Sequence, residues 1–435
     1  MRTAMRLGAG VLLALTLLPV QAQQAAPADK AIVVVKVPAG ATVSIGDFPT
    51  TQTGTERQFI TPALAPGKNY FYILKASWTE NGQPKSETRE VLVKAGARVL
   101  ADFTAPVAKA GPPPAPVEPE PKAVEPKVVP KPEAKAGEPK SRTFLLTYAV
   151  ELSGLPQDKA ARVWLPAPSS SDDQEIEIAD AKSLPEGYKI DKEPTYGNQI
   201  VYSEVKGDKD GKAQLAVTYK VKRKEVVGPT KAEIPDAAKL GRYLEPDKLG
   251  PLDGKPLELI KGKAIPADQM ALGKMLYDVV NAHVKYSKEG TGWGRGDVEW
   301  VCDSKTGNCT DFHSLFISLA RANKVPAKFE MGIPLPPKRG EGEIGGYHCW
   351  AYFKPEGKGW VAVDISEANK DPKMTEYYFG NLTEDRVTFT TGRDYDLVPK
   401  QDGPMRNYLI YPYVELDGKE LPAAQIKRKF TFKDL

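Results

Sequence analysis

The sequence predicts an α+β fold in which a core of helices and strands is preceded by a β-sandwich and by a separate small all-β domain. Short runs rich in β-branched and aromatic residues, punctuated by Gly, Pro and Asn, fill much of the first half. A proline-rich stretch divides these runs into two groups. Further along, two segments with helical periodicity are followed by more strands, which is typical of an α+β core.

The composition limits the classes of partner. The chain has 435 residues, enough for two or three domains, and its 60 Lys and Arg nearly balance its 56 Asp and Glu. This balance gives no reason to expect nucleic acid as a partner. No stretch after the N-terminus approaches the roughly 18 apolar residues of a membrane helix, so we expect no transmembrane segment. The three Cys and three His lack the usual metal-ligand spacings, so we expect neither a metal nor another cofactor.

The first residues predict export. Arg2 and Arg6 precede a short apolar run, and small residues follow it up to Ala22. We therefore expect residues 1–22 to be a secretory signal peptide, too short to span a membrane as a helix. The mature protein is then expected to be periplasmic, extracellular or part of the cell envelope, where disulfides are permitted.

Residues 30–104 predict the small all-β domain, because their strand-like runs are separated by turn residues and contain neither Cys nor His. Part of this stretch, "VPAGATVSIGD" with "FITPALAPGKNYFYILKASW", resembles the PEGA-like β-modules of bacterial envelope proteins. The resemblance implies a binding or spacer unit, with a cell-wall or envelope component as its candidate partner.

The remaining divisions follow from composition and periodicity. Residues 105–141 are about a third proline, cannot build a core and are expected to form a semi-rigid linker. Residues 142–227 predict the β-sandwich, and residues 228–262 a connecting segment with weak periodicity. We expect the core at residues 263–400, and C-terminal strands packed on that core at residues 401–435.

Two amphipathic helices and three strands are predicted in the core. Apolar residues recur at 3.6-residue spacing in the first helix at Leu272, Met275, Leu276, Val279, Val280, His283 and Val284. The second helix starts at Cys309, and its apolar stripe contains Phe312, Leu315, Phe316, Leu319 and Ala320. The strands follow as "AKFEMGI", "YHCWAYF" and "WVAVDI".

Cys309 lies where a cysteine can be activated. Gly307 allows the chain to turn, and Asn308 is a favourable N-cap residue, so Cys309 falls in the first turn of the helix. Unpaired backbone N–H groups and the positive end of the helix dipole favour a thiolate there. The same N–H groups can later face an oxyanion.

The hairpin that follows supplies a base and a carboxylate. Antiparallel pairing centred on Glu356, in the turn "PEGKG", places His348 opposite Asp364. Directly opposed residues share a sheet face, with Cβ atoms about 4.5–5.5 Å apart. We therefore predict a triad of Cys309, His348 and Asp364.

These residues lie in motifs that resemble a known family. "GNCTDFHSLFISLAR", "GGYHCWAYF" and "GWVAVDISEA" look like the three motif blocks of the transglutaminase-like superfamily. The segments "GWGRGD", "YYFGNL" and "GRDYDL" are similar to flanking segments of its bacterial members. The resemblance implies a papain-like fold, thiol acyl transfer and a catalytic triad of Cys309, His348 and Asp364. It also implies an aromatic residue that supports the oxyanion, for which Trp293 and Trp300 are candidates, together with Asn308 as the helix cap.

The implied reaction proceeds through an acyl-thioester on a protein or peptide substrate. If water resolves the thioester, the chain is a cysteine peptidase or amidase, and we favour this hydrolase because water is abundant. If an amine resolves it, the chain is a cross-linking transglutaminase, an acyltransferase. The other alternative is a non-catalytic binding scaffold of the envelope, against which the intact triad argues.

Two further interpretations concern the other Cys and His residues. His313 lies four residues after Cys309 on the same helical face, which makes it a rival base, although a buried histidine bonded to the backbone is the simpler interpretation. Strand alternation turns Cys349 away from His348, so we expect a small core residue. Cys302 is expected in a loop, and a Cys302–Cys349 disulfide is the alternative for this pair.

Limited proteolysis is expected to cut the linker before either flanking segment, because residues 105–140 lack apolar content for a core. The expected product is a stable fragment that begins near Arg142 and keeps the activity of the intact chain. Mass spectrometry of the fragments and an activity assay check this. Loss of activity on cleavage would mean that residues 30–104 form part of the site.

Overall fold

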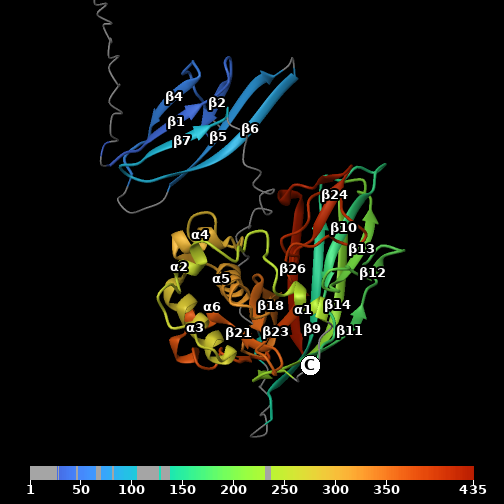
Figure 1. Ribbon diagram of the computed structural model, residues 1–435. Coiled ribbons are helices and arrows are strands. Elements are labelled where there is room, and N and C mark those ends of the chain that lie inside the picture. Colours follow the sequence, from blue (N-terminus) through green and yellow to red (C-terminus); the bar gives the residue numbers. More distant parts are fainter. Residues whose placement is uncertain are drawn as a thin grey trace, which may run out of the picture. The chain divides into compact units, whose positions relative to one another are not determined.

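The computed structural model describes residues 27, 29–45, 48–64, 70–80, 83–104, 127–128, 138–230 and 237–435. Contacts divide the chain into two compact units, Met1–Lys109 and Ala110–Leu435 (Figure 1). The expected signal peptide, most of the expected linker and part of the connecting segment lie outside the described residues. Within the described ranges, we find no helix whose length and apolarity would let it cross a membrane.

The first unit consists of two small sheets packed face to face. One has the order β4-β1-β7 and the other β3-β2-β5-β6. Alternating apolar residues from both sheets form its core, including Val33 and Val35 on β1, Leu74 on β5 and Val91 on β6. The strands are β1 Ile32–Lys36, β2 Thr42–Ile45, β3 Phe48–Pro49, β4 Glu56–Ile60, β5 Tyr70–Glu80, β6 Gln83–Val93 and β7 Arg98–Asp102.

The second unit contains the larger β-sandwich, with sheet orders β12-β13-β10-β24-β25 and β11-β14-β9-β26-β19-β8. Its central strand β9 alternates strictly between buried and less buried residues, as a strand with one face on a core should. The first strands are β8 Lys127–Val128, β9 Ser141–Leu152, β10 Ala161–Ala167, β11 Gln174–Asp180, β12 Lys189–Lys192, β13 Gln199–Val205 and β14 Ala213–Lys224. The others are β19 Gly340–Ile344, β24 Tyr413–Leu416, β25 Lys419–Glu420 and β26 Ile426–Asp434.

The C-terminal segment contacts both the core and the sandwich. Residues 401–435, which we expected to pack on the core, share its buried cluster through Ile410 and Phe430. They also enter the sandwich, since β24 pairs with β10 and β26 lies between β9 and β19. The reason is the alternation in β26, where Phe430 and Phe432 are buried while Lys427 and Lys433 point to solvent. β26 therefore joins the sandwich to β19, a strand from the middle of the core sequence.

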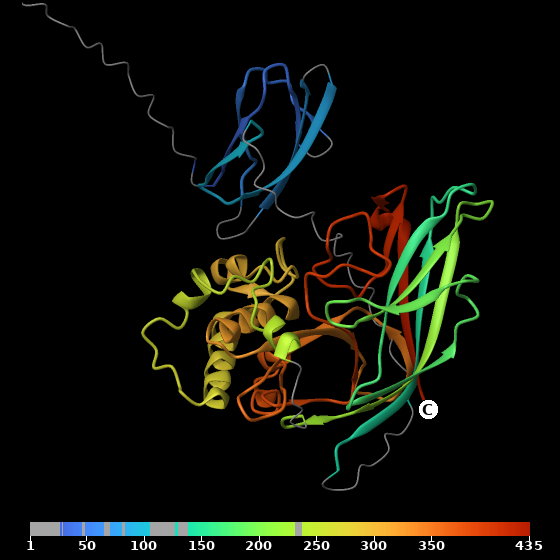
Figure 2. The ribbon, with the colours of Figure 1, turned by 45° about the vertical axis from the view of Figure 1, so that its right-hand side comes forward.

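The core itself combines helices with a sheet of order β21-β20-β18-β23. The helix α5 is buried along nearly its whole length and contacts both β18 and β20. Figures 1 and 2 show the helices, yellow to orange, on one side of this unit and the long sandwich strands, green and red, on the other. The main elements are α3 Gln269–His283, α4 Val298–Ser304, α5 Cys309–Ala322, α6 Ile365–Lys370, β18 Ala327–Pro334, β20 His348–Phe353, β21 Val361–Val363 and β23 Arg386–Thr391.

The two predicted helices and three predicted core strands are present, with α4 and β23 in addition. Cys302 accordingly lies in α4 rather than in a loop. The expected linker also contributes a short strand, because β8 pairs with the edge strand β19. We therefore expect proteolytic cuts in the linker before and after β8. The remaining elements are α1 Ala237–Arg242, α2 Lys255–Glu258, η1 Pro372–Met374, η2 Ala423–Gln425, β15 Val226–Val227, β16 Lys285–Tyr286, β17 Thr306–Gly307 and β22 Asn381–Leu382.

The position of β26 predicts that Phe430→Ala is strongly destabilising. Phe430 is 3% exposed and its ring stacks on Tyr148 with centroids 4.2 Å apart. Removing this ring should lower the free energy of unfolding of the second unit by about 3–5 kcal/mol. Denaturant titration measures this.

The matched control is Lys429→Ala, on the same strand. Its side chain is 56% exposed and pairs with Glu343 at the surface, so the expected change is within about 0.5 kcal/mol. Equal effects of the two substitutions would show that β26 does not contribute its buried face to the stability of the fold.

Candidate active site

The N-terminus of α5 is held by a capping box. The Asn308 side chain accepts a hydrogen bond from the Thr310 N–H at 2.9 Å, and the Asp311 carboxylate accepts one from the Asn308 N–H at 2.9 Å. Gly307 is required here, because a Cβ atom at this position would lie 2.5 Å from the Cβ of Asp311. The cap fixes Cys309 as the first helical residue.

Asp311 also binds the segment that precedes α4. Its two carboxylate oxygens accept hydrogen bonds from the backbone N–H groups of Gly294 at 2.7 Å and Gly296 at 2.9 Å. Burial raises the pKa of Asp311 to about 7 against the effect of these hydrogen bonds. The sequence showed Asp311 only as a neighbour of His313. The available signal for this contact was the repeated glycines of "GWGRGD", because backbone N–H groups without neighbouring side chains can be approached closely by a carboxylate.

His348 and Asp364 meet directly. The His348 Nε2 atom lies 2.7 Å from Asp364 Oδ2, and both side chains are buried. His348 is the first residue of β20, whereas Asp364 follows β21 and is the N-cap of α6. The cap geometry directs the other carboxylate oxygen to the N–H of Glu367 at 3.2 Å. Asp364 therefore caps α6 and also binds the imidazole of His348.

The predicted hairpin register was wrong. The observed ladder pairs Ala351 with Val363 and Phe353 with Val361, so the turn is centred on Gly357, not on Glu356. Gly357 has φ 69°, a conformation that suits glycine at this turn. The shift moves every partner by two residues and so preserves the face on which each side chain lies. For this reason His348 still meets Asp364, although the two are not opposed in the ladder.

A buried arginine completes the surroundings of Asp364. The Arg386 Nη1 atom donates to Asp364 Oδ2 at 2.9 Å, and its guanidinium lies 4.8 Å from the centre of the Trp350 ring. Burial opposes ionisation of Asp364, but the charges of His348 and Arg386 outweigh it, so the pKa of Asp364 is lowered far below its usual value. Sequence reasoning missed Arg386, because nothing local in the sequence shows that β23 pairs with β18 beside the site.

The surroundings of Cys309 and His348 favour a thiolate and an imidazolium. Burial opposes ionisation of the Cys309 thiol, but hydrogen bonds from Cys349 and His348 and the charge of His348 lower its pKa well below the usual value. Burial likewise opposes the charge on His348, but Asp364 raises the pKa of His348 to about 9. The His348 Nε2 atom is occupied by Asp364, so Nδ1 is the nitrogen left for the Cys309 sulfur.

His313 takes the simpler of the two roles weighed from the sequence. Its Nε2 atom accepts a hydrogen bond from the Ile365 N–H at 3.0 Å, and its ring is fully buried. Burial lowers the pKa of His313 to about 4, against the effect of Asp364, so the ring is neutral near neutral pH. Its Nε2 atom is 3.8 Å from Asp364 Oδ1, whereas His348 is 2.7 Å from the same carboxylate.

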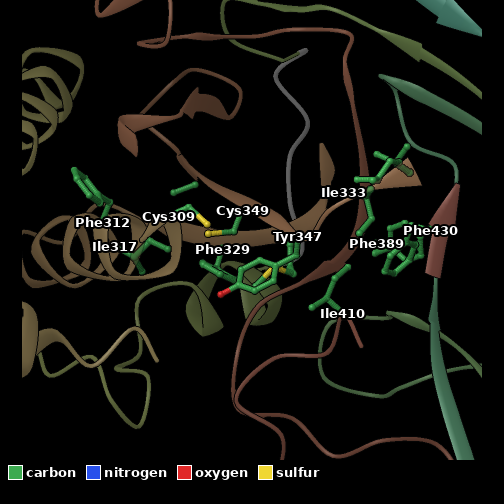
Figure 3. Packing of buried hydrophobic residues seen from close by; sticks show 14 of the residues in the cluster. Cys309, Phe312, Ile317, Phe329, Ile333, Tyr347, Cys349, Phe389, Ile410 and Phe430 are labelled. Atoms are coloured by element: carbon green, nitrogen blue, oxygen red, sulfur yellow. The ribbon is translucent and has the colours of Figure 1, made fainter. Parts of the chain in front are cut away.

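All three cysteines are free and buried, so no Cys302–Cys349 disulfide is present. Burial raises the pKa of Cys302 to about 11 and that of Cys349 well above its usual value. The Cys349 side chain does point away from His348 along the strand, but it points toward α5. Figure 3 shows the Cys349 sulfur beside that of Cys309.

The three candidates for oxyanion support have different surroundings. The Trp293 indole N–H donates to the Gly290 carbonyl at 3.0 Å, and the Asn308 side-chain N–H₂ group donates to Tyr347 Oη at 2.8 Å. Trp300 lies on α4, with its ring packed against Gly292. Cys309 is 3% and His348 6% exposed, so little of either residue is accessible to solvent.

In the part of the chain that the structure describes, no three His, Cys, Asp or Glu side chains are grouped so as to hold a metal ion.

The comparisons with known proteins match the core. Residues 262–365 match the family model of the Transglutaminase-like superfamily. A curated protein of Haemophilus influenzae, described as uncharacterized, is 33% identical over 162 residues, which covers 30% of this chain and 44% of that protein. The match thus spans less than half the length of that curated relative.

Solved structures were also found, among them the following two. A protein of Cytophaga hutchinsonii provisionally described as a cysteine protease has a TM-score of 0.45 and 16% identity, covering 68% of this chain and 91% of its own. The periplasmic domain of TgpA from Pseudomonas aeruginosa has a TM-score of 0.28 and 14% identity, covering 56% of this chain and 98% of its own.

The contacts of His348 predict how Cys309 alkylation depends on pH. Alkylation requires the thiolate, so its rate in the wild type should rise as the pH passes the lowered pKa of Cys309. His348→Gln removes the positive charge, and the midpoint should move up toward about 8.5, the value of an ordinary thiol. Asp364→Asn should shift the midpoint in the same direction but less, because the imidazole remains. Mass spectrometry of the peptide that contains Cys309 measures the rates.

His283→Gln is the matched control for these variants. His283 lies on α3, and its Nε2 atom contacts the Cys302 carbonyl at 3.2 Å. We expect no shift of the midpoint in this variant. If folded His348→Gln keeps the wild-type pH dependence of alkylation, His348 is not the residue that lowers the pKa of Cys309.

Proposed function

Because residues 262–365 form a transglutaminase-like domain, we propose that the chain is an exported thiol enzyme that cleaves or transfers acyl groups at peptide or carboxamide bonds. The observation that carries this proposal is the connected set of contacts from Cys309, at the N-terminus of α5, through His348 to the buried Asp364. A nucleophile, a base and a group that orients the base are the parts that thiol acyl transfer needs.

The proposed reaction has two stages. The Cys309 thiolate attacks the carbonyl carbon, and the resulting tetrahedral intermediate collapses to an acyl-thioester as the C–N bond breaks. The His348 imidazolium gives its proton to the departing amine. In the second stage His348 accepts a proton from water, which attacks the thioester and releases the carboxylic acid and the thiolate. Asp364 keeps the imidazole oriented and stabilises its cation throughout.

The developing oxyanion needs hydrogen-bond donors. We propose the backbone N–H groups at the start of α5, which the capping box leaves aligned at the positive end of the helix. Trp293 donates its single indole N–H to Gly290 in this structure, so we propose Trp300 as the contributing aromatic. Asn308 donates one amide hydrogen to Tyr347, which leaves the second for the oxyanion.

The setting of this reaction is also proposed. The basic and apolar residues before Ala22 support export to the periplasm or cell envelope, with a protein or peptide as substrate. The first unit is proposed to be the PEGA-like module suggested by its sequence, binding an envelope component and keeping the enzyme near it. Hydrolysis is favoured over cross-linking because water is the abundant acyl acceptor in that compartment.

Acylation by p-nitrophenyl acetate tests the proposed function. The wild type should release p-nitrophenolate in a burst of about one equivalent and carry one acetyl group on Cys309. The intermediate should then decay in water. Adding a primary alkylamine should not divert most of the acyl group if the enzyme is a hydrolase, and should do so if it is a cross-linking transglutaminase.

Cys309→Ala should abolish both the burst and the mass increase, whereas Cys302→Ala should keep them. Cys302 is a suitable control because it is equally a buried free cysteine, and it lies on α4 outside the triad. A wild-type chain that shows neither a burst nor a reactive Cys309 would favour the non-catalytic scaffold.

A further inference from the structure

Cys349 contacts the nucleophile but belongs to none of the roles described so far. It is fully buried on β20, and its sulfur points toward the first turn of α5 (Figure 3). The Cys349 Sγ atom lies 3.6 Å from His313 Nδ1 and 3.8 Å from Thr310 Oγ1. Its sulfur also lies beside that of Cys309 (Figure 3). A thiol in this place can donate one hydrogen and accept others.

The hydrogen bonds of His313 determine the direction of these contacts. The Ile365 backbone N–H donates to His313 Nε2 at 3.0 Å, so that nitrogen carries a lone pair. The neutral ring therefore carries its hydrogen on Nδ1, the atom that faces Cys349. This hydrogen has two acceptors in reach, the Cys349 sulfur and the Cys309 backbone carbonyl. When the sulfur accepts it, the S–H of Cys349 is directed to another neighbour.

Two acceptors lie within reach of that S–H. One is Thr310 Oγ1 at 3.8 Å, and the other is the Cys309 sulfur. A charged acceptor forms a stronger hydrogen bond than a neutral hydroxyl, so the Cys309 thiolate is the preferred partner. Burial keeps Cys349 protonated by raising its pKa, so the donor persists when Cys309 ionises.

We propose that the Cys349 S–H is a second hydrogen-bond donor to the Cys309 thiolate. This inference rests on the proposed function, because it assigns a role around the nucleophile of that reaction. His348 gives its proton away during turnover, whereas Cys349 keeps its proton. Cys349 therefore stabilises the thiolate in every step in which the Cys309 sulfur carries charge.

Several ionisable groups face Cys309, and each contributes to its titration. From the elements packed around it, they are His313 and Asp311 on α5, His348 and Cys349 on β20, Tyr347 before β20, Asp364 at the start of α6 and Lys370 at its end. Only the donor from Cys349 is altered in the experiment below, so the other groups form a common background.

The experiment compares the pH dependence of Cys309 alkylation by iodoacetamide in the full chain. Cys349→Ala should move the midpoint upward by about one pH unit, the scale of one hydrogen bond to a charged group. Cys349→Ser keeps a donor of similar size, so its midpoint should stay near that of the wild type. Cys302→Ala, which removes a buried thiol outside the site, should leave the midpoint unchanged.

The pattern across the variants decides the outcome. If the alanine and serine variants shift equally, Cys349 only fills space, and if neither shifts, it does not bond to the thiolate; either result overturns the inference. Cys349→Val also lacks a donor and fills more of the space, so it replaces the alanine variant if that one does not fold. A wild-type midpoint near that of an ordinary thiol would overturn the proposed function together with this inference.

Discussion

The charge of Asp364 is the constraint on which the rest of the site depends. A carboxylate that is fully buried is costly unless charged and hydrogen-bonding partners surround it. Here His348 comes from β20, Arg386 from β23, and the Glu367 N–H from the first turn of α6. Three separate elements must therefore assemble before the charge is compensated. Because the same charge raises the pKa of His348, it also favours the imidazolium that faces Cys309.

The surroundings of Cys309 follow the same logic, because the thiolate is also a buried anion. Its sulfur is almost as buried, and its lowered pKa is the net result of burial opposed by donors. His348 is held by Asp364, and Cys349 is in contact with His313. Two separately held side chains therefore lie at the Cys309 sulfur. His313 is neutral and His348 is charged, because only His348 bonds directly to Asp364 at 2.7 Å. Two buried histidines of the same core thus differ in charge according to their partners.

Periodicity and alternation in the sequence predicted the helices and the strand faces, which depend on neighbouring residues. The helical periodicity identified α3 and α5, and strand alternation gave the faces of β20 correctly even though the hairpin register was shifted. The register failed because the turn residues do not reveal that Gly357 takes the positive φ. Arg386 and the donor role of Cys349 were missed because both depend on pairings between distant segments, which leave no periodic pattern in the sequence. The placement of β26 between β9 and β19 is of the same kind.

These distant pairings give the β-sandwich a part in the chemistry. Arg386 begins β23, and the next residues of that strand are bound from the sandwich by Gln174, which donates to the Thr388 carbonyl at 2.9 Å and accepts from its N–H at 2.9 Å. On the other side Arg142, the second residue of β9, donates to Asp385 at 2.7 Å. Both anchors are buried, so they restrict where Arg386 can lie. Since Arg386 bonds to the same oxygen of Asp364 as His348, the sandwich helps to position that carboxylate through β23.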